Sequence, residues 1–362
     1  MKKTIKLKYL KLLTSNTKNK KIINWLVENK IPYSTNIELG KKSWLKAGGI
    51  AEFFIQPESI EDTVKLIRFL INQNINYYPV GNISNTLFRD GVIKTPLINL
   101  KNIKNTIIKI DNRNREILTF KASAGMTLFK YVNYLQSNFF LSGQEGLIGI
   151  PGTIGGAIYT NASSYNSSIS DYIVKLEYIN DKGEVITLKK EEIQFGWRYS
   201  IFHEKKNFLI LQVYFNFPLK KTENKEFFDE KVMKIREDRK KFQENKLPNL
   251  GSLYATKNLY RDLSKISITL FFLYIIYLVG TKLIYVIYNG KYLLRFRRLM
   301  IRLYSAYFGI GNDHFSLSEK TINCLVNKGS SKSVEAFKLI YKLEKKIKNK
   351  IRLENVLVED IE

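Results

Sequence analysis

Apolar residues recur in patterns that divide the first hundred residues into a strand–helix–strand unit. Residues 20–29 place apolar side chains among cations, as a short amphipathic helix does. Residues 51–56 form an apolar run typical of a strand. Ser59 is then placed to cap a helix, with Asp62 three residues further on. Residues 75–80 predict the next strand.

The middle of the chain is predicted to be mainly β. Segments that alternate or stay apolar over strand-like lengths are residues 106–110, 116–122, 173–179, 184–188 and 208–215. The first two flank a turn at residues 112–114, and the next two flank a turn at residues 181–183, so two hairpins are expected. Thr127 is placed to cap a helix that runs through Tyr134.

The last third of the chain is predicted to be mixed. A basic helix is expected over residues 226–245 and is broken by Pro248 and Gly251. Ser333 is placed to cap a second helix, and residues 351–358 predict a closing strand. Taken together, these patterns predict an α+β fold.

A glycine-rich stretch interrupts the central β region. It reads Gly149, Ile150, Pro151, Gly152, Thr153, Ile154, Gly155, Gly156 and Ala157, and no charged residue lies between Glu145 and Asp171. Such a stretch offers bare N–H groups to a flat or anionic ligand, or lets two elements cross tightly. By itself the pattern leaves both interpretations open, and it matches neither a Walker loop nor G-x-G-x-x-G. A second polar loop, residues 81–87, resembles loops that hold phosphates.

Composition narrows the function classes. The formal charge is +26, from 59 Lys+Arg against 33 Asp+Glu, but the cations are spread along the chain, so no nucleic-acid partner is expected. Two histidines, His203 and His314, lie far apart, which argues against a metal site or a histidine-based triad. With Cys324 as the single cysteine and no signal peptide expected, the sequence predicts a cytoplasmic protein.

Several motifs occur in an order typical of one enzyme family. They are residues 43–51, the loop 81–87 with Asp90 and Gly91, residues 143–147 leading into the glycine stretch and Asn161, residues 194–202, residues 239–243 with 248–252, residues 318–327, and residues 353–354. In this order the chain resembles UDP-N-acetylenolpyruvoylglucosamine reductase from about Asn36 to Asn355, with one interruption.

The resemblance implies an FAD-binding half of two α+β subdomains and a C-terminal α+β substrate-binding domain. It also implies NADPH and a UDP-sugar as partners, with hydride passing from reduced FAD to an enolpyruvyl group and a proton following. Its catalytic residues would be Arg198 for the substrate carboxylate, Ser252 as proton donor and Glu354 as a third polar group. Alone, each could be an ordinary surface, turn or strand residue.

The cofactor residues that the resemblance implies lie in two loops and their neighbours. They are Gly81, Asn82, Ser84, Asn85, Gly125, Gly149, Ile150, Gly152, Thr153, Gly155, Gly156 and Asn161. In this context the glycine stretch is interpreted as the surface that binds FAD.

The sequence departs from the family at several positions. Trp197 stands where the family prefers tyrosine, and Ile83 replaces a glycine of the flavin loop, which places bulk close to the expected pyrophosphate. Residues 161–166 lack the usual glycines, and residues 253–258 lack the aromatic-x-Asn-Pro ending after Ser252. These departures leave open a related flavin oxidoreductase on another nucleotide sugar, or a flavin-binding homologue without turnover.

The interruption is an apolar and basic insertion at residues 263–311. Residues 266–281 are uncharged, and arginines follow between residues 291 and 302. Peripheral contact with the inner membrane and packing against this fold or a second subunit both stay open, ahead of a true span. The expected domains are a basic extension (1–19), FAD-binding subdomains at 20–99 and 100–218, and the interrupted C-terminal domain at 219–362.

Overall fold

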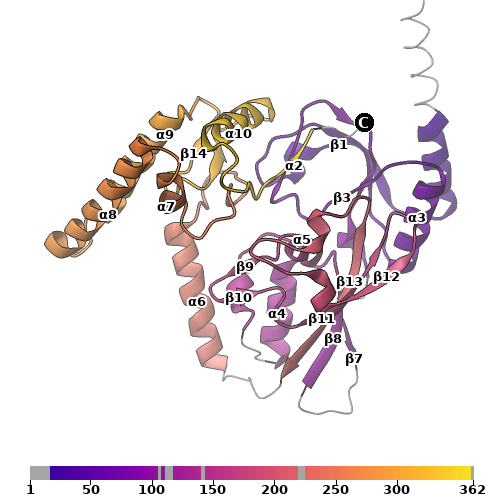
Figure 1. Ribbon diagram of the computed structural model, residues 1–362. Coiled ribbons are helices and arrows are strands. Elements are labelled where there is room, and N and C mark those ends of the chain that lie inside the picture. The colour runs from indigo at the N-terminus through magenta and orange to yellow at the C-terminus, as the bar shows by residue number, and fades with distance from the viewer. Residues whose placement is uncertain (1–16, 105–106, 111–116, 140–142, 219–224, 360–362) are drawn as a thin grey trace, which may run out of the picture.

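The computed structural model describes residues 17–104, 107–110, 117–139, 143–218 and 225–359 (Figure 1). Within these residues the fold is α+β, as predicted. Residues 17–28 are helical, and Trp25 stacks on Phe69 with the ring centroids 4.5 Å apart. The turn expected at residues 112–114 lies outside the described residues.

The first sheet lies at the centre of the N-terminal subdomain. Its central strands β2, β6 and β3 are parallel, β1 is antiparallel to β2, and β5 also pairs with β2. The elements are β1 (Tyr33–Glu38), α2 (Leu39–Lys42), β2 (Ile50–Ile55), α3 (Ile60–Asn72), β3 (Tyr78–Pro79), β4 (Thr86–Phe88), β5 (Val92–Ile93) and β6 (Leu97–Ile98). Ser59 caps α3 by accepting a hydrogen bond from the Asp62 N–H, as predicted. The strand predicted at residues 75–80 is reduced to β3.

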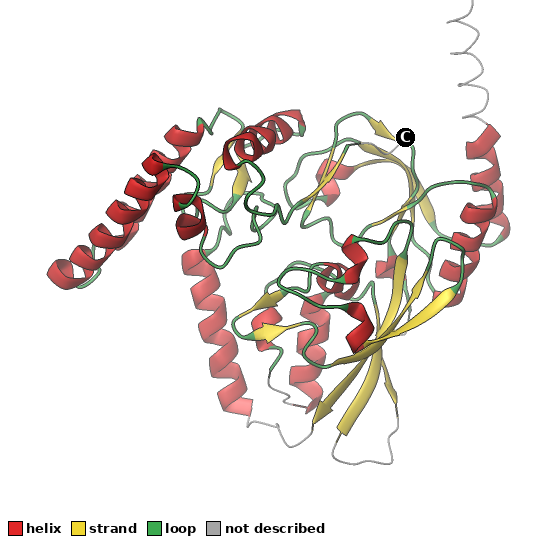
Figure 2. Cartoon of the chain, viewed as in Figure 1, coloured by secondary structure: helices red, strands yellow, loops and turns green. Residues whose placement is uncertain are grey.

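The second sheet is antiparallel throughout and forms the layer of strands in the lower part of Figure 2. Its strand order is β12-β11-β13-β8-β7. The strands are β7 (Ile107–Ile110), β8 (Ile117–Ser123), β11 (Ile173–Ile179), β12 (Val185–Lys189) and β13 (Leu209–Pro218); helices α4 (Leu128–Phe139) and α5 (Ile154–Tyr159) and the pair β9 (Ser163–Ser164) and β10 (Ser167–Ser168) lie between them in the chain. Tyr131 of α4 packs on Phe120 and Phe215 of this sheet. Both predicted hairpins are present.

The C-terminal part is mainly helical. Its elements are α6 (Lys225–Phe242), α7 (Leu259–Ser264), α8 (Ile268–Tyr288), α9 (Leu293–Phe308), β14 (Phe315–Leu317), β15 (Leu325–Asn327), α10 (Val334–Ile347) and β16 (Val356–Val358). Short 3-10 turns occur at Leu100–Asn102, Glu145–Leu147, Lys190–Ile193 and Ile201–His203. The closing strand predicted over residues 351–358 is reduced to β16, which pairs in parallel with β4 and so returns the chain to the N-terminal subdomain.

The cap predicted for α10 is wrong in its detail. Ser333 occupies the N-cap position, but its hydroxyl makes no cap hydrogen bond. Instead Asp90 accepts hydrogen bonds from the N–H groups of Ser333 and Val334 at 2.8 and 2.9 Å. The α10 cap is therefore a contact between the N-terminal subdomain and the C-terminal part.

Buried side chains form one large cluster that spans the first and second sheets. It runs from Ile22 to Phe217 and includes Val232 and Ile235 of α6. A second cluster gathers the C-terminal part, from Leu250 to Ile351, around Leu45, Ala47 and Leu87. The predicted domain boundaries stay predictions, although the described buried residues of α6 pack with the first cluster and not with the second.

Candidate functional site

A cavity of about 940 Å³ opens between the two sheets and the end of the chain. The segments that line it include the start of loop 81–85, the glycine stretch, the beginning of β13 and strand β16. The predicted cofactor residues that line it are Gly81, Asn85, Gly125, Thr153, Gly155 and Gly156. Segments far apart in the sequence thus meet at one concave surface.

Three of these glycines are needed for packing. A Cβ at Gly125 would lie 1.9 Å from the Leu100 carbonyl oxygen, and one at Gly81 would lie 2.6 Å from Thr153 Oγ1. A Cβ at Gly155 would lie 3.1 Å from Ala124 Cβ. Gly156 differs, because the nearest atom to its Cβ position is Thr153 Oγ1 at 3.6 Å. The two interpretations of the glycine stretch therefore hold at different residues, because Gly155 is tightly packed whereas Gly156 has room for a Cβ at ordinary contact distance.

The other predicted cofactor residues lie beside the cavity and do not line it; they are Asn82, Ser84, Gly149, Ile150, Gly152 and Asn161. Asn82 Nδ2 donates to the Pro151 carbonyl at 2.9 Å and so ties the polar loop to the glycine stretch. Gly149 takes a φ of +79° next to the side chain of Arg239. These contacts shape the loops.

Ile83 does not place its bulk where the sequence predicts. Its φ of +50° is in the left-handed region, which is unfavourable for a β-branched residue and costs on the order of 1–3 kcal/mol. The side chain is buried in a cluster with Leu39 and Phe88. Burial there offsets the backbone strain and keeps Ile83 out of the cavity lining.

The cavity suits a flavin dinucleotide in shape and chemistry. Tyr159, Phe202 and Phe208 supply apolar wall, while Lys205 and Lys206 supply positive charge for a diphosphate. On the other segments that line the cavity, the close-packed glycines leave backbone N–H groups uncovered by side chains, where they can bind a ligand. The residues present therefore fit FAD.

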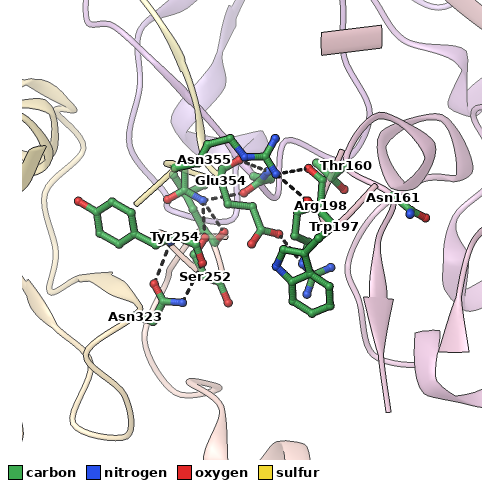
Figure 3. A network of polar contacts seen from close by, with 12 residues as sticks. Thr160, Asn161, Trp197, Arg198, Ser252, Tyr254, Asn323, Glu354 and Asn355 are labelled. Carbon is green, nitrogen blue, oxygen red and sulfur yellow. Dashed lines mark hydrogen bonds and ion pairs between the residues drawn. The ribbon is translucent and has the colours of Figure 1, made fainter. Parts of the chain in front are cut away.

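The three predicted catalytic residues meet outside this cavity (Figure 3). Arg198 Nε lies 3.4 Å from Glu354 Oε1, and both side chains are largely buried. Ser252 is exposed, and its carbonyl oxygen accepts a hydrogen bond at 3.0 Å from Asn355, the neighbour of Glu354. The Glu354 N–H also donates to the Leu253 carbonyl at 2.7 Å, so the two segments run side by side.

The turn that carries Arg198 is held from two sides. Gly196 and Tyr199 pair through their backbones, and Arg198 lies between them with a φ of +54°. Asn161 Nδ2 donates to the Gly196 carbonyl at 2.8 Å. From the other side, Arg352 Nη2 donates to the carbonyls of Trp197 and Arg198 at 2.9 and 2.7 Å. These bonds fix a strained turn and thereby the direction of the guanidinium.

The polar loop reaches the segments that carry the predicted catalytic residues Ser252 and Glu354 through Asn85. Asn85 Nδ2 donates to the Glu354 carbonyl at 3.0 Å, and Asn355 Nδ2 donates to Asn85 Oδ1 at 2.6 Å. The same Asn355 amide donates to the carbonyls of Leu250 and Ser252 at 3.2 and 3.0 Å. Asn85 thus both lines the cavity and supports the segments that carry Ser252 and Glu354.

Electrostatics favour an acidic ligand beside Arg198. Burial raises the pKa of Glu354, even though Arg198 and Arg352 both act to lower it, so the carboxyl holds a proton to higher pH than usual. Burial lowers the pKa of the nearby Arg239, and Arg198 lowers it further. Arg239 Nη2 donates to the Gly146 carbonyl and to Ser164, while its buried Nε has no partner among the described residues. Arg198 and Arg352 thus both act on Glu354, and Arg239 lies close to Arg198, so guanidinium groups surround a carboxyl whose pKa burial raises.

Sequence reasoning missed Arg352 and Asn355, and it placed Asn161 and Asn85 only as cofactor residues. Arg352 and Asn355 flank Glu354 within two positions, which is the one signal that could have drawn attention to them. Trp197, the departure from the family, is half exposed and lies under Lys257 and Arg198, whose charged groups are 5.1 and 5.6 Å from the ring. The tryptophan keeps an aromatic surface for these cations.

Comparison with known proteins agrees with this geometry. Residues 51–189 match a family model described as an FAD binding domain. UDP-N-acetylenolpyruvoylglucosamine reductase from Listeria welshimeri is 30% identical over 224 residues, which cover 62% of this chain and 71% of that protein. The Clostridium botulinum (strain Eklund 17B) protein of the same name is 30% identical over 219 residues, covering 60% of this chain and 68% of that protein.

A solved structure shows the same fold. The crystal structure of UDP-N-acetylenolpyruvylglucosamine reductase from Thermus caldophilus superposes with a TM-score of 0.62 at 19% identity, covering 91% of this chain and 98% of that one. The predicted fold class is thereby confirmed. With the FAD-binding match and relatives at this identity and coverage, the chain belongs to the UDP-N-acetylenolpyruvoylglucosamine reductase family, the FAD-containing oxidoreductases of peptidoglycan precursor synthesis.

Proposed function

We propose that this chain reduces the enolpyruvyl group of UDP-N-acetylglucosamine enolpyruvate to give UDP-N-acetylmuramate in the cytoplasm, with NADPH as the reductant. The observation that carries the proposal is the meeting of Arg198, Glu354 and Ser252 in one place. These residues come from segments up to 156 positions apart, and Arg198 Nε lies 3.4 Å from Glu354 Oε1. Their proximity supports a shared chemical task.

The cavity residues would hold the cofactor. Gly81, Asn85, Gly125, Thr153 and Gly156 would hold FAD through the backbone and short polar side chains, and Lys205 and Lys206 would face its diphosphate. When bound, the flavin supplies hydride to C3 of the enolpyruvyl group. The chain's task is to bind that group, to stabilise negative charge on it and to deliver a proton to C2.

Arg198 would bind the carboxylate of the enolpyruvyl group. Negative charge builds on this carboxylate as C3 accepts hydride, and a guanidinium fixed by its turn stabilises that charge without reorganising. Arg239 adds a second positive group in the same region. A UDP-sugar also carries a diphosphate, so two cations in the region suit this substrate better than a neutral one.

Ser252 would protonate C2, and Glu354 would support the transfer. A serine hydroxyl is a weak acid, so it needs a setting that supplies or stabilises the proton. Burial raises the pKa of Glu354, and a carboxyl that stays protonated can donate a hydrogen bond toward the forming enolate or replace the proton lost from Ser252. Asn355 holds both segments together through the Ser252 carbonyl.

The two half-reactions separate these roles. Ser252→Ala should leave reduction of the bound flavin by NADPH unchanged in stopped-flow absorbance, because that step requires no proton at C2. Turnover with the enolpyruvyl substrate should fall about 10²–10⁴-fold, the usual contribution of a positioned proton donor. Ser264→Ala, a serine of the same part of the chain on α7, serves as the matched control. Wild-type turnover by Ser252→Ala would remove Ser252 from the mechanism.

A further inference from the structure

Helix α8 exposes an apolar surface that the fold does not cover. It has 21 residues; its most apolar stretch of 18 residues has a mean hydropathy of 2.1, and only 6% of that stretch is buried. Lys282 is its single charged residue. Exposed fractions reach 57% at Phe272, 51% at Val279 and 76% at Val286. In Figure 1, α8 and α9 project together away from the rest of the molecule.

The width of this surface distinguishes between two kinds of partner. At 100° per residue, the exposed apolar residues of α8 other than its last residue, Tyr288, span an arc of roughly 200°, from Tyr285 through Phe272 to Ile287. A partner helix or a second copy of the chain covers a stripe of about 100°. A lipid phase can contact an arc of twice that width, whereas a single partner helix cannot, so lipid fits α8 better than one packed helix does.

The exposed face of α9 has the composition of a membrane interface. Leucine and arginine alternate along it in the exposed pairs Leu294 and Arg295, Arg298 and Leu299, and Arg302 and Leu303. Arginines at this spacing lie on one face and can reach phosphate groups while the leucines face acyl chains. Tyr288 and Tyr292, at the turn between α8 and α9, are amphipathic residues that favour the same depth. The positive charge complements anionic headgroups.

The ends of the hairpin fix its orientation. Leu270 at the start of α8 is buried, and so are Met300, Tyr304 and Phe308 of α9, all in the C-terminal core. Both ends therefore lie on the same side of any membrane, and α9 carries too many arginines to cross one. Lys282 lies within the exposed arc, and at interfacial depth its long side chain can extend to the headgroups.

We propose that the α8–α9 hairpin docks this protein flat on an anionic lipid bilayer, with the exposed arc of α8 at the boundary between headgroups and acyl chains and the α9 arginines on the phosphates. The proposal does not depend on the reaction catalysed. Deep insertion would bring Lys282, Lys291 and Arg295 into hydrocarbon, so the depth is that of an interfacial helix pair.

Flotation of the full-length protein with vesicles tests the proposal. Vesicles of phosphatidylcholine alone and of equal parts phosphatidylcholine and phosphatidylglycerol are compared at 50 and 500 mM NaCl. The wild type should float with the anionic vesicles at low salt and lose much of that binding at high salt. The double variant Phe272→Glu/Val279→Glu should lose binding at least tenfold. Met233→Glu, at a residue of α6 that is 60% exposed, should bind as the wild type does.

The arginines give an independent arm. Replacing Arg295, Arg298 and Arg302 together with glutamine should weaken anionic binding about a hundredfold, at roughly fivefold for each charge, and should leave the weaker binding to neutral vesicles unchanged. All substituted positions are exposed, so each variant should unfold at the wild-type temperature, which a thermal scan checks. A wild type that does not float, or that forms a stable dimer broken by Phe272→Glu/Val279→Glu without binding vesicles, would overturn the proposal.

Discussion

Replacing Arg352 with methionine removes the two hydrogen bonds that hold the Arg198 turn against the C-terminal segment. The Arg352 guanidinium donates to the carbonyls of Trp197 and Arg198 at 2.9 and 2.7 Å. Each bond of this kind is worth about 1 kcal/mol net, so the pair contributes about 2 kcal/mol to holding a turn whose φ at Arg198 is +54°. If that energy fixes the guanidinium for the transition state, kcat/KM should fall about 30-fold.

The pH profile separates positioning from general damage. Arg352 acts to lower the pKa of Glu354, which burial raises, so its loss should raise that pKa further. A protonated Glu354 is the active form proposed here, so activity is present below its pKa and is lost as pH rises through it. In Arg352→Met the alkaline limb of kcat/KM should therefore move to higher pH.

Lysine at the same position is the matched control. Arg352→Lys keeps the positive charge but loses the planar fork that reaches two carbonyls. It should show the reduced kcat/KM with the alkaline limb unmoved. Steady-state kinetics with the enolpyruvyl substrate between pH 6 and 10 measure both quantities. Wild-type kcat/KM and an unchanged limb in Arg352→Met would refute the assigned role.

Further substitutions test three separate parts of the account. Gly156→Ala should leave the unfolding temperature of the flavin-free protein unchanged or slightly higher, because its Cβ has room in α5, yet its flavin content should drop. Gly155→Ala should lower the unfolding temperature, because its Cβ is crowded by Ala124. Thermal scans measure the unfolding temperature of both variants, and flavin absorbance measures their flavin content. Asp90→Ala should destabilise the protein by about 1–2 kcal/mol in urea because the α10 cap is lost, whereas Ser333→Ala should cost less. Glu354→Gln should remove the alkaline limb of kcat/KM and lower turnover about 10²–10⁴-fold.

Each of these has a clear contrary result. Flavin content in Gly156→Ala equal to the wild type would show that this glycine does not face the cofactor. Equal destabilisation by Asp90→Ala and Ser333→Ala would mean that the serine hydroxyl contributes to the α10 cap after all. An alkaline limb retained by Glu354→Gln would assign that limb to another group.

Local patterns were sufficient to predict the elements whose partners are nearby in sequence. The α3 cap at Ser59 and both hairpins are confirmed, because capping and alternation depend on a few adjacent residues. The α10 cap was wrong because Asp90, 243 positions away, provides it. Likewise the closing strand is short because Leu353 bridges to Tyr254 and the Glu354 carbonyl bonds to Asn85.

The candidate site was predictable as a set of motifs but not as a geometry. Residue order identified Arg198, Ser252 and Glu354 together, while nothing in the sequence links Arg352 to the carbonyl of Arg198. Contacts to main-chain carbonyls leave no side-chain pattern in the partner, so sequence alone does not reveal them. The glycine stretch is a similar case, because composition does not distinguish a glycine required for packing, such as Gly155, from one that faces a cavity, such as Gly156.

The proposed function is tested most directly by the absorbance spectrum of the purified protein combined with NADPH oxidation in the presence of UDP-N-acetylglucosamine enolpyruvate. The account predicts a bound-flavin spectrum from the cavity lined by Gly156 and Asn85, and NADPH oxidation that depends on the enolpyruvyl substrate. A protein that carries flavin but oxidises no NADPH when that substrate is added would contradict the assigned reaction.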